Sequence, residues 1–176
     1  MLLFEGFIGI LNNILMWSHY ADNHKGICIC FRSKKAKDGH YLHLKSSAKL
    51  VSSPFFDINY EDNLPPAINM FGNQNLTIFL LTKYTEWEYE KEFRMLIFED
   101  EFDDGITKYE KNDLEGIIFG LKINRKTVEQ IHNVINENYL KEGIDVHFYE
   151  AKEVQGKYKI QIEKINDFDA YLESLE

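Results

Sequence analysis

The chain has 176 residues, of which 44% are apolar and 14% aromatic, so it can bury a sizeable core and is neither a disordered nor a repetitive protein. Its 20 basic against 29 acidic residues give a net charge of −9, which argues against duplex nucleic acid as a partner, because that binding depends on many Lys and Arg contacts to phosphates. Two cysteines, Cys28 and Cys30, cannot build a disulfide framework, so we expect one soluble, cytoplasmic domain over residues 1–176.

The first sixteen residues are strongly apolar. Their large side chains recur at spacings of three and four, which predicts an amphipathic helix with one buried face. Glu5 and the Asn12–Asn13 pair interrupt the run, and it is shorter than the roughly 20 apolar residues that span a bilayer. We therefore expect neither a signal peptide nor association with a membrane. The residues that define the stripe are Phe4, Phe7, Ile8, Leu11, Ile14 and Leu15.

The middle of the chain alternates short extended segments with breaks. Residues 27–31 are continuously apolar and β-branched, which predicts a buried strand. The basic run at 32–37 predicts a solvated turn, with binding of a phosphate or a partner as the alternative. Asn75 stands where it can begin a helix that reaches Thr85. Further strands are expected at 41–45, 49–51, 58–60 and 92–98.

The C-terminal third carries the clearest local signals. Residues 114–119 predict a buried strand that ends at Gly120, and Asn124 can cap the helix that follows. Gly143 suits the left-handed residue after that helix. The pattern as a whole predicts an α+β fold, with a mixed or antiparallel sheet and two or three packed helices. The helix buries Val128, Ile131, Val134, Ile135 and Leu140, and two strands follow at 146–149 and 157–162.

A first group of polar residues lies at 17–26, in the sequence WSHYADNHKG. Loops held between a helix and a strand often carry function, so His19 is a candidate catalytic residue. The spacing of His19 and His24 does not suit zinc, and no metal site is expected. The alternative is structural: Trp17 fills the core while Ser18 and Asp22 cap a helical turn. The candidate ligand-binding residues are Trp17, Tyr20, His24 and Lys25.

A second group follows the pattern K-x3-W-x-Y-E-x-E-x-R at 83–94. If this stretch is extended, Glu90, Glu92 and Arg94 lie on one face. Two neighbouring carboxylates can provide a general base, which makes Glu92 and Glu90 candidate catalytic residues, while Arg94 can bind a phosphate or carboxylate. Lys83 and Trp87 are candidate ligand-binding residues. An ordinary ion pair between Glu90 and Arg94 is the alternative.

These two motifs and the IIFG sequence at 117–120 resemble a large bacterial family of unknown function, over about Leu15 to Ile162. Cys30 and Phe93 stand where Glu and Trp are common in that family. Members usually carry a longer N-terminal part with an early strand, so the resemblance implies that this chain is truncated at its N-terminus.

The family resemblance supplies no accepted activity, so a mechanism rests on analogy. Glu92, two residues after Glu90, is similar to the third motif of ADP-ribosyltransferases, which implies that Glu92 stabilises an oxocarbenium-like centre and that Tyr20 or His19 contacts the nucleotide. The sequence thus predicts an enzyme-like cleft that handles a nucleotide or phosphorylated small molecule. The alternative is a non-enzymatic interaction module, with phage defence as one setting, in which the motifs are structural and the acidic surface meets a protein partner. Whether the chain is an enzyme, and its cofactor and protein partner, stay open.

Overall fold

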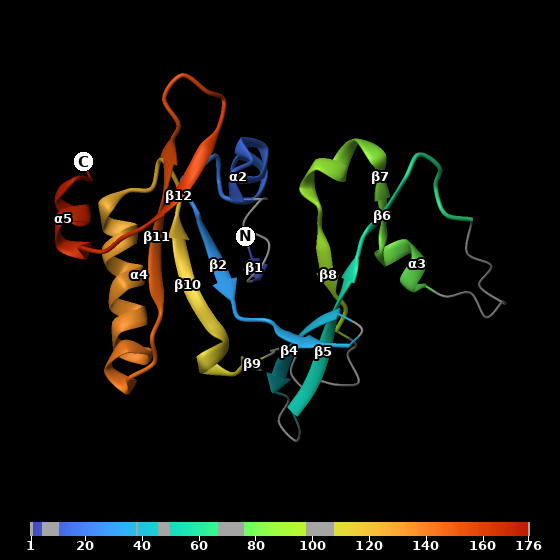
Figure 1. The fold of residues 1–176 in the computed structure, drawn as a ribbon, viewed down its shortest axis with the longest axis horizontal. Coiled ribbons are helices and arrows are strands. Elements are labelled where there is room, and N and C mark those ends of the chain that lie inside the picture. The colour runs from blue at the N-terminus through green and yellow to red at the C-terminus, as the bar shows by residue number, and fades with distance from the viewer. Residues whose placement is uncertain are drawn as a thin grey trace. The chain divides into compact units, whose positions relative to one another are not determined.

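The computed structural model describes residues 2–4, 11–37, 39–45, 50–66, 76–97 and 108–175. They fall into two compact units, drawn in Figure 1. Unit 1 comprises residues 1–33 and 109–176, and unit 2 comprises residues 34–108. The single domain expected from the sequence stays a prediction.

Unit 1 is built on a five-stranded mixed sheet, in the order β1-β2-β10-β11-β12. Strand β1 runs parallel to β2, and β2 runs antiparallel to β10. Strand β10 runs parallel to β11, and β11 runs antiparallel to β12. Mixed pairing of this kind, together with helices, confirms the predicted α+β class. The strands are β1 (Leu2–Phe4), β2 (Ile27–Phe31), β10 (Leu114–Phe119), β11 (His147–Glu153) and β12 (Ile160–Lys164).

Helices cover both faces of this sheet (Figure 1). On one face, Trp17 of α2 packs with Cys28, Ile118 and Ile160 from three strands. On the other, Phe168 of the C-terminal helix packs against aromatic residues of the sheet. The helical elements are α2 (Ile14–Tyr20), η3 (Lys111–Asp113), α4 (Arg125–Asn138), η4 (Leu140–Glu142) and α5 (Phe168–Glu173).

Helix α4 confirms the cap and part of the burial expected from the sequence. The Asn124 side-chain oxygen accepts a hydrogen bond from the Thr127 backbone N–H at 2.9 Å, as an N-cap residue does. Val128 and Ile135 are buried, whereas Val134, expected in the apolar stripe, is 59% exposed. Gly143 adopts the expected left-handed conformation, with φ of 79°.

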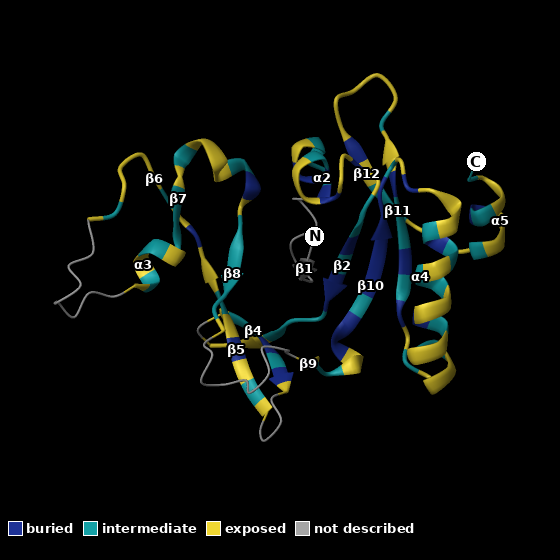
Figure 2. Ribbon diagram, turned by 180° about the vertical axis from the view of Figure 1, so that it is seen from behind, coloured by how far each residue is buried: buried dark blue, intermediate teal, exposed yellow. Residues whose placement is uncertain are grey.

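Unit 2 holds an antiparallel sheet in the order β3-β4-β5-β8 and a separate parallel pair, β6 and β7. A short helix and a 3-10 helix flank β7 in the chain, and β9 pairs with β4. Figure 2 shows that burial is dense along β10 of unit 1 and sparse on α3 and η1 of unit 2. The elements are β3 (Lys34–Ala36), β4 (Gly39–Lys45), β5 (Leu50–Asp57), β6 (Asn59–Glu61), α3 (Thr77–Leu80), β7 (Thr82–Tyr84), η1 (Thr85–Glu90), β8 (Phe93–Met95) and β9 (Lys108–Tyr109).

Several predicted elements are wrong in type or extent. Residues 2–4 form a strand that pairs with β2 rather than the start of a helix, whereas Leu11 is helical and α2 begins at Ile14 after Asn13 caps it. Residues 5–10 lie outside the described part of the chain. The basic run contains strand β3, because it pairs with β4.

The helix expected from Asn75 to Thr85 is a single turn at Thr77–Leu80, because the next residues form β7 against β6. Asn75 itself lies outside the described residues. The strand expected at 92–98 covers only Phe93–Met95 in the described part, and helix α5 was not predicted. Among the described residues, no helix combines the length and apolar character needed to cross a membrane.

Candidate functional site

The loop after α2 returns the chain sharply into β2. Three consecutive residues, Asp22, Asn23 and His24, have φ values of 46°, 50° and 71°. Asp, Asn and His are the side chains that tolerate this left-handed region best after glycine. The His24 N–H donates to the Trp17 carbonyl at 3.2 Å and closes the loop onto the helix. The polar composition of 17–26 therefore has a conformational cause.

The same loop is fixed to the segment that follows β10. The Lys122 N–H donates to the His24 carbonyl at 2.9 Å, and the Gly120 N–H donates to the Gly26 carbonyl at 3.0 Å. A β-carbon at position 120 would lie 2.3 Å from the His24 carbonyl oxygen, closer than any normal contact. The glycine of the IIFG sequence is thus needed because the first motif docks there, a link that the sequence did not predict.

Trp17 occupies the core of unit 1. Its side chain is fully buried and its indole N–H donates to the Leu11 carbonyl at 2.8 Å. A buried tryptophan normally needs such a partner for its N–H. This placement favours the structural role for Trp17 over contact with a ligand.

His24 is buried and lies beside Ser18. Its Nε2 is 3.1 Å from the Ser18 hydroxyl oxygen, while that hydroxyl donates to the Ile14 carbonyl at 3.2 Å. A Ser18 hydroxyl that donates to Ile14 can only accept from His24, through Nε2–H, which is the reverse of what a base that activates serine would do. Burial, aided by the positive charge of Lys122, lowers the pKa of His24.

The other candidates of the first motif lie at the surface of unit 1. His19, Tyr20 and Lys25 are exposed, and the rings of His19 and Tyr20 meet edge to face, 6.3 Å between centroids. The carboxylates expected to share a cleft with them belong to unit 2. Their proximity to Glu92 therefore stays a prediction.

The second motif is not an extended chain. Thr85–Glu90 forms the 3-10 helix η1, and Lys91 then turns the chain with φ of 43° before β8 begins. The Lys91 N–H donates to the Glu88 carbonyl at 3.1 Å. The predicted alternation of Glu90, Glu92 and Arg94 along one face is therefore wrong.

These residues nevertheless meet, through ion pairs inside unit 2. Lys83 forms ion pairs with Glu90 and, at 3.1 Å, with Glu92. Arg94 holds Glu92 in two places: Nε is 2.5 Å from Oε1 and Nη2 is 3.1 Å from Oε2. The Glu90 side chain is only 1% exposed. We call Lys83, Glu90, Glu92 and Arg94 the ion-pair network.

Further contacts tie the ion-pair network to the surrounding backbone. Tyr60, which was not a candidate from the sequence, accepts a hydrogen bond from the Glu92 N–H at 2.8 Å. Arg94 donates to the Leu80 carbonyl at 2.5 Å. The Lys83 ammonium lies 5.0 Å from the centre of the Trp87 ring, within range of a cation–π contact. The network thus connects β6, α3, η1 and β8.

The charges of the ion-pair network are balanced against one another. Burial alone would raise the pKa of Glu92, but hydrogen bonds from Arg94 and Lys83 outweigh it, and the pKa is lowered. Burial alone would lower the pKa of Lys83, but its bonds to Glu90 and Glu92 leave the pKa raised. A general base at neutral pH needs a pKa shifted upward. Glu92 is therefore poorly suited to proton transfer.

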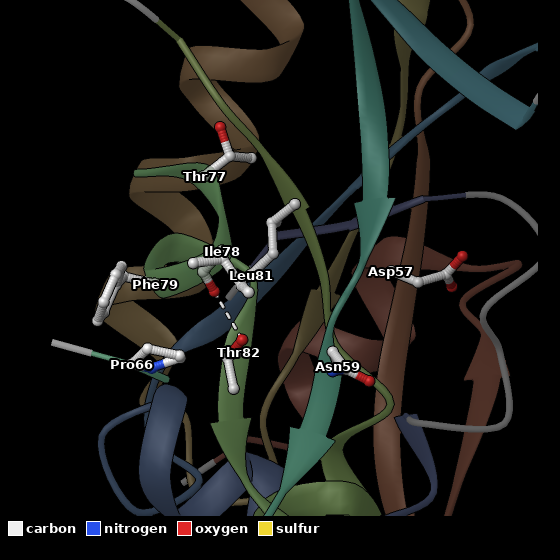
Figure 3. Close-up of a pocket in the computed structure, with 8 residues that line it drawn as sticks. All are labelled: Asp57, Asn59, Pro66, Thr77, Ile78, Phe79, Leu81 and Thr82. Atoms are coloured by element: carbon white, nitrogen blue, oxygen red, sulfur yellow. Dashed lines mark hydrogen bonds between the residues drawn. The ribbon is translucent and has the colours of Figure 1, made fainter. Parts of the chain in front are cut away.

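A cavity of about 570 Å³ lies on another part of unit 2 (Figure 3). Neighbouring residues on a strand point to opposite faces of the sheet. Asn59 and Thr82, which line the cavity, are paired across β6 and β7, and the next pair along is Tyr60 with Lys83 of the ion-pair network. The cavity and the ion-pair network therefore lie on opposite faces of the β6–β7 pair. None of the site residues predicted from the sequence is among the described lining residues, which are Asp57, Asn59, Pro66, Thr77, Ile78, Phe79, Leu81 and Thr82.

No metal centre is formed within the described ranges, where no three His, Cys, Asp or Glu side chains gather closely enough to hold an ion.

Comparison with known proteins supports the family resemblance in part. Residues 16–95, somewhat under half of the chain, match the model of a family described as a protein of unknown function, DUF2971. The matched range contains the segments 17–26 and 83–94, whereas residues 117–120 lie beyond it. No curated protein and no solved structure matches the chain. The wider extent of the resemblance and the N-terminal truncation stay predictions.

Proposed function

We propose that the protein is a non-enzymatic binding module, in which the ion-pair network is scaffold and the cavity of unit 2 is the binding site. The observation that carries this proposal is the engagement of Glu92, whose two oxygens are taken up by Arg94 and Lys83. Three of the roughly four acceptor sites of this carboxylate are thus occupied by cations of the same chain, which favours a structural role. The four charged groups connect β7, η1 and β8 instead.

The energetics of the network agree with a structural role. A carboxylate as deeply buried as Glu90 is tolerated only when it is paired, because an isolated buried charge costs several kcal/mol. Lys83 supplies that pair. A structural role therefore accounts for Lys83, Arg94, Glu90 and Glu92 in the second motif, and no substrate is needed to explain them.

The cavity supplies the binding site that this interpretation requires. Its volume of about 570 Å³ falls within the 300–1,000 Å³ typical of small-molecule sites. Most of its wall is apolar, with a few polar groups, which is the usual composition of such sites. The β6–β7 pair stands between it and the ion-pair network, so scaffold and binding site share the same two strands.

The experiment that tests this proposal compares the wild type with Glu92→Gln by thermal unfolding, with and without NAD, ADP-ribose and ATP. We expect no nucleotide to raise the melting temperature of either protein. We expect Glu92→Gln to melt lower, by about 2–4 °C for each kcal/mol of stability lost. Glu88→Gln is the matched control, because Glu88 is an exposed carboxylate on the preceding 3-10 helix η1 and its replacement should leave the melting temperature unchanged.

The competing prediction, a nucleotide-handling cleft, gives the opposite pattern. A ligand that binds the folded state raises its stability by mass action, roughly 2.7 kcal/mol at a hundredfold excess over Kd. A nucleotide-dependent rise in melting temperature that disappears in Glu92→Gln, while Glu88→Gln keeps it, would overturn the proposal.

A further inference from the structure

We infer that the cavity of unit 2 binds a small molecule with an apolar body and a positively charged amine, and that it disfavours phosphates and carboxylates. This inference rests on the proposed function, since it names the ligand class of the same site.

The apolar part of the wall comes from the segment around α3. Ile78, Phe79 and Leu81 line the cavity together with Pro66, and in Figure 3 all four lie to the left of Asp57 and Asn59. Ile78 remains 49% exposed. Covering apolar surface of this kind stabilises a complex by about 25 cal/mol per Å². An aliphatic or aromatic body is the ligand part that gains most here.

The negative charge of the cavity wall determines which polar group of a ligand is favoured. Asp57 is the one charged side chain among the described lining residues, and its carboxylate has no hydrogen bond or ion pair within the described part of the chain. No described Lys, Arg or His lines the cavity. An ammonium group is attracted to this carboxylate, and a phosphate is repelled.

Neighbouring polar groups strengthen the preference. The Asn59 side-chain amide donates to Glu61 at 2.9 Å, which brings a second carboxylate beside the same stretch of strand. The Thr82 hydroxyl donates to the Ile78 carbonyl at 2.6 Å, so its hydrogen is already used and only its lone pairs remain. The Thr82 hydroxyl oxygen can therefore accept a hydrogen bond from an ammonium group. The cations Lys83 and Arg94 are directed to carboxylates of the ion-pair network.

The experiment uses three probes with the same body and different heads: 4-phenylbutylamine, 4-phenylbutanol and 4-phenylbutyrate. Each is titrated into the full chain labelled at Ile and Leu methyl groups, and NMR shifts of Ile78 and Leu81 give the Kd. We expect the amine to bind tightest and the carboxylate weakest. We expect Asp57→Asn to weaken the amine about two- to five-fold, the range of an exposed ion pair, and to leave the alcohol unchanged.

Two variants control the result. Glu86→Gln removes one exposed carboxylate of unit 2 that does not line the cavity, and should preserve the order of the three probes. Ile78→Asp places a charge in the apolar wall and should abolish binding of the alcohol. Equal Kd values for amine and alcohol, or tightest binding of the carboxylate, would overturn the ligand class. If no probe shifts Ile78 or Leu81 up to about 10 mM, where even weak ligands bind, the cavity does not take ligands with this apolar body and the inference is overturned.

Failure of this inference is separable from failure of the proposed function. The inference that the cavity prefers an amine is tested only by the NMR shifts of Ile78 and Leu81, and the melting temperature of Glu92→Gln does not affect it. The proposed function fails on a nucleotide response that depends on Glu92, whatever the probes do.

Discussion

The carbonyl oxygen of His24 stands where a β-carbon on Gly120 would approach it to 2.3 Å, and the Gly26 carbonyl oxygen would be 2.8 Å from the same atom. Both oxygens are backbone atoms of the loop that connects α2 to β2. They cannot move aside as a flexible side chain can, because hydrogen bonds from Lys122 and Gly120 hold them. This contact joins two motifs that are about a hundred residues apart in the sequence.

Replacing Gly120 by alanine should therefore destabilise unit 1 by about 1–3 kcal/mol, the usual cost of forcing extra atoms into a packed site. The measurement is urea unfolding of Trp87→Phe, in which the fluorescence comes from Trp17 of unit 1 alone. Lys122→Ala is the control, since it keeps the backbone N–H that binds His24. Equal midpoints for Gly120→Ala and Lys122→Ala would contradict the steric argument.

His24 should make unit 1 sensitive to acid. Burial and the Lys122 charge lower its pKa in the folded state from the ordinary 6.5, so the unfolded chain binds the proton first as pH falls. The contribution of His24 is therefore complete above pH 6.5 and is lost progressively below it. For one proton the slope is at most about 1.4 kcal/mol per pH unit.

The check is urea unfolding at several values between pH 5 and 7.5, for the wild type and for His24→Gln. The variant should show a shallower fall in unfolding free energy below pH 6.5. His132→Gln gives an internal comparison, because burial also lowers the pKa of His132, where its ring stacks on Phe168 at 4.0 Å between centroids. Parallel curves for wild type and His24→Gln would refute the role of His24.

Lys83 and Glu90 should be energetically coupled. Removing one partner of a buried ion pair leaves the other uncompensated, so Glu90→Gln should cost about 3 kcal/mol, and less to the extent that Lys83 stays 17% exposed. Lys83→Met alone should cost a similar amount, while the double variant should cost clearly less than the sum. Thermal or chemical unfolding followed by circular dichroism measures all three, and strict additivity would show that the two side chains act independently.

The fold could be predicted where the signal is local. Residues 27–31 and 114–119 are apolar runs, and the structure confirms both strands. The Asn124 cap depends only on contacts within the first turn of the helix, and α4 is confirmed as well. The segment 82–84 is different, because its partner is the strand Asn59–Glu61, some twenty residues earlier. Pairing with a distant strand overrode the helical spacing of its apolar residues.

The candidate site was predictable as a set of residues but not as a geometry. The sequence placed Lys83, Glu90, Glu92 and Arg94 in one motif, and they do meet. Their arrangement depends on the left-handed conformation of Lys91, which no spacing rule indicates for a lysine. The cavity was missed because its described lining residues, which come from β5, β6, Pro66 and the segment around α3, belong to no charged motif.

The last prediction concerns Arg32, whose side chain donates hydrogen bonds to three backbone carbonyls of unit 1. Nη1 donates to the Asn112 and Leu114 carbonyls at 2.9 and 3.1 Å, and Nη2 donates to the Asp145 carbonyl at 3.3 Å. Nε pairs with Glu115. The planar guanidinium satisfies these acceptors at once, whereas a lysine ammonium is a single point with three donors and cannot span them.

Arg32→Lys should therefore destabilise unit 1 by about 1–3 kcal/mol, although it keeps the charge. The matched control is Arg125→Lys, because Arg125 makes only an exposed pair with Glu129 one turn along α4, a contact worth about 0.3–0.5 kcal/mol. Unfolding followed through Trp17 in the Trp87→Phe background compares the two variants directly. If both lose the same small amount, Arg32 acts only as a surface charge, and the basic run to which it belongs regains its alternative interpretation as a place where a phosphate or a partner binds.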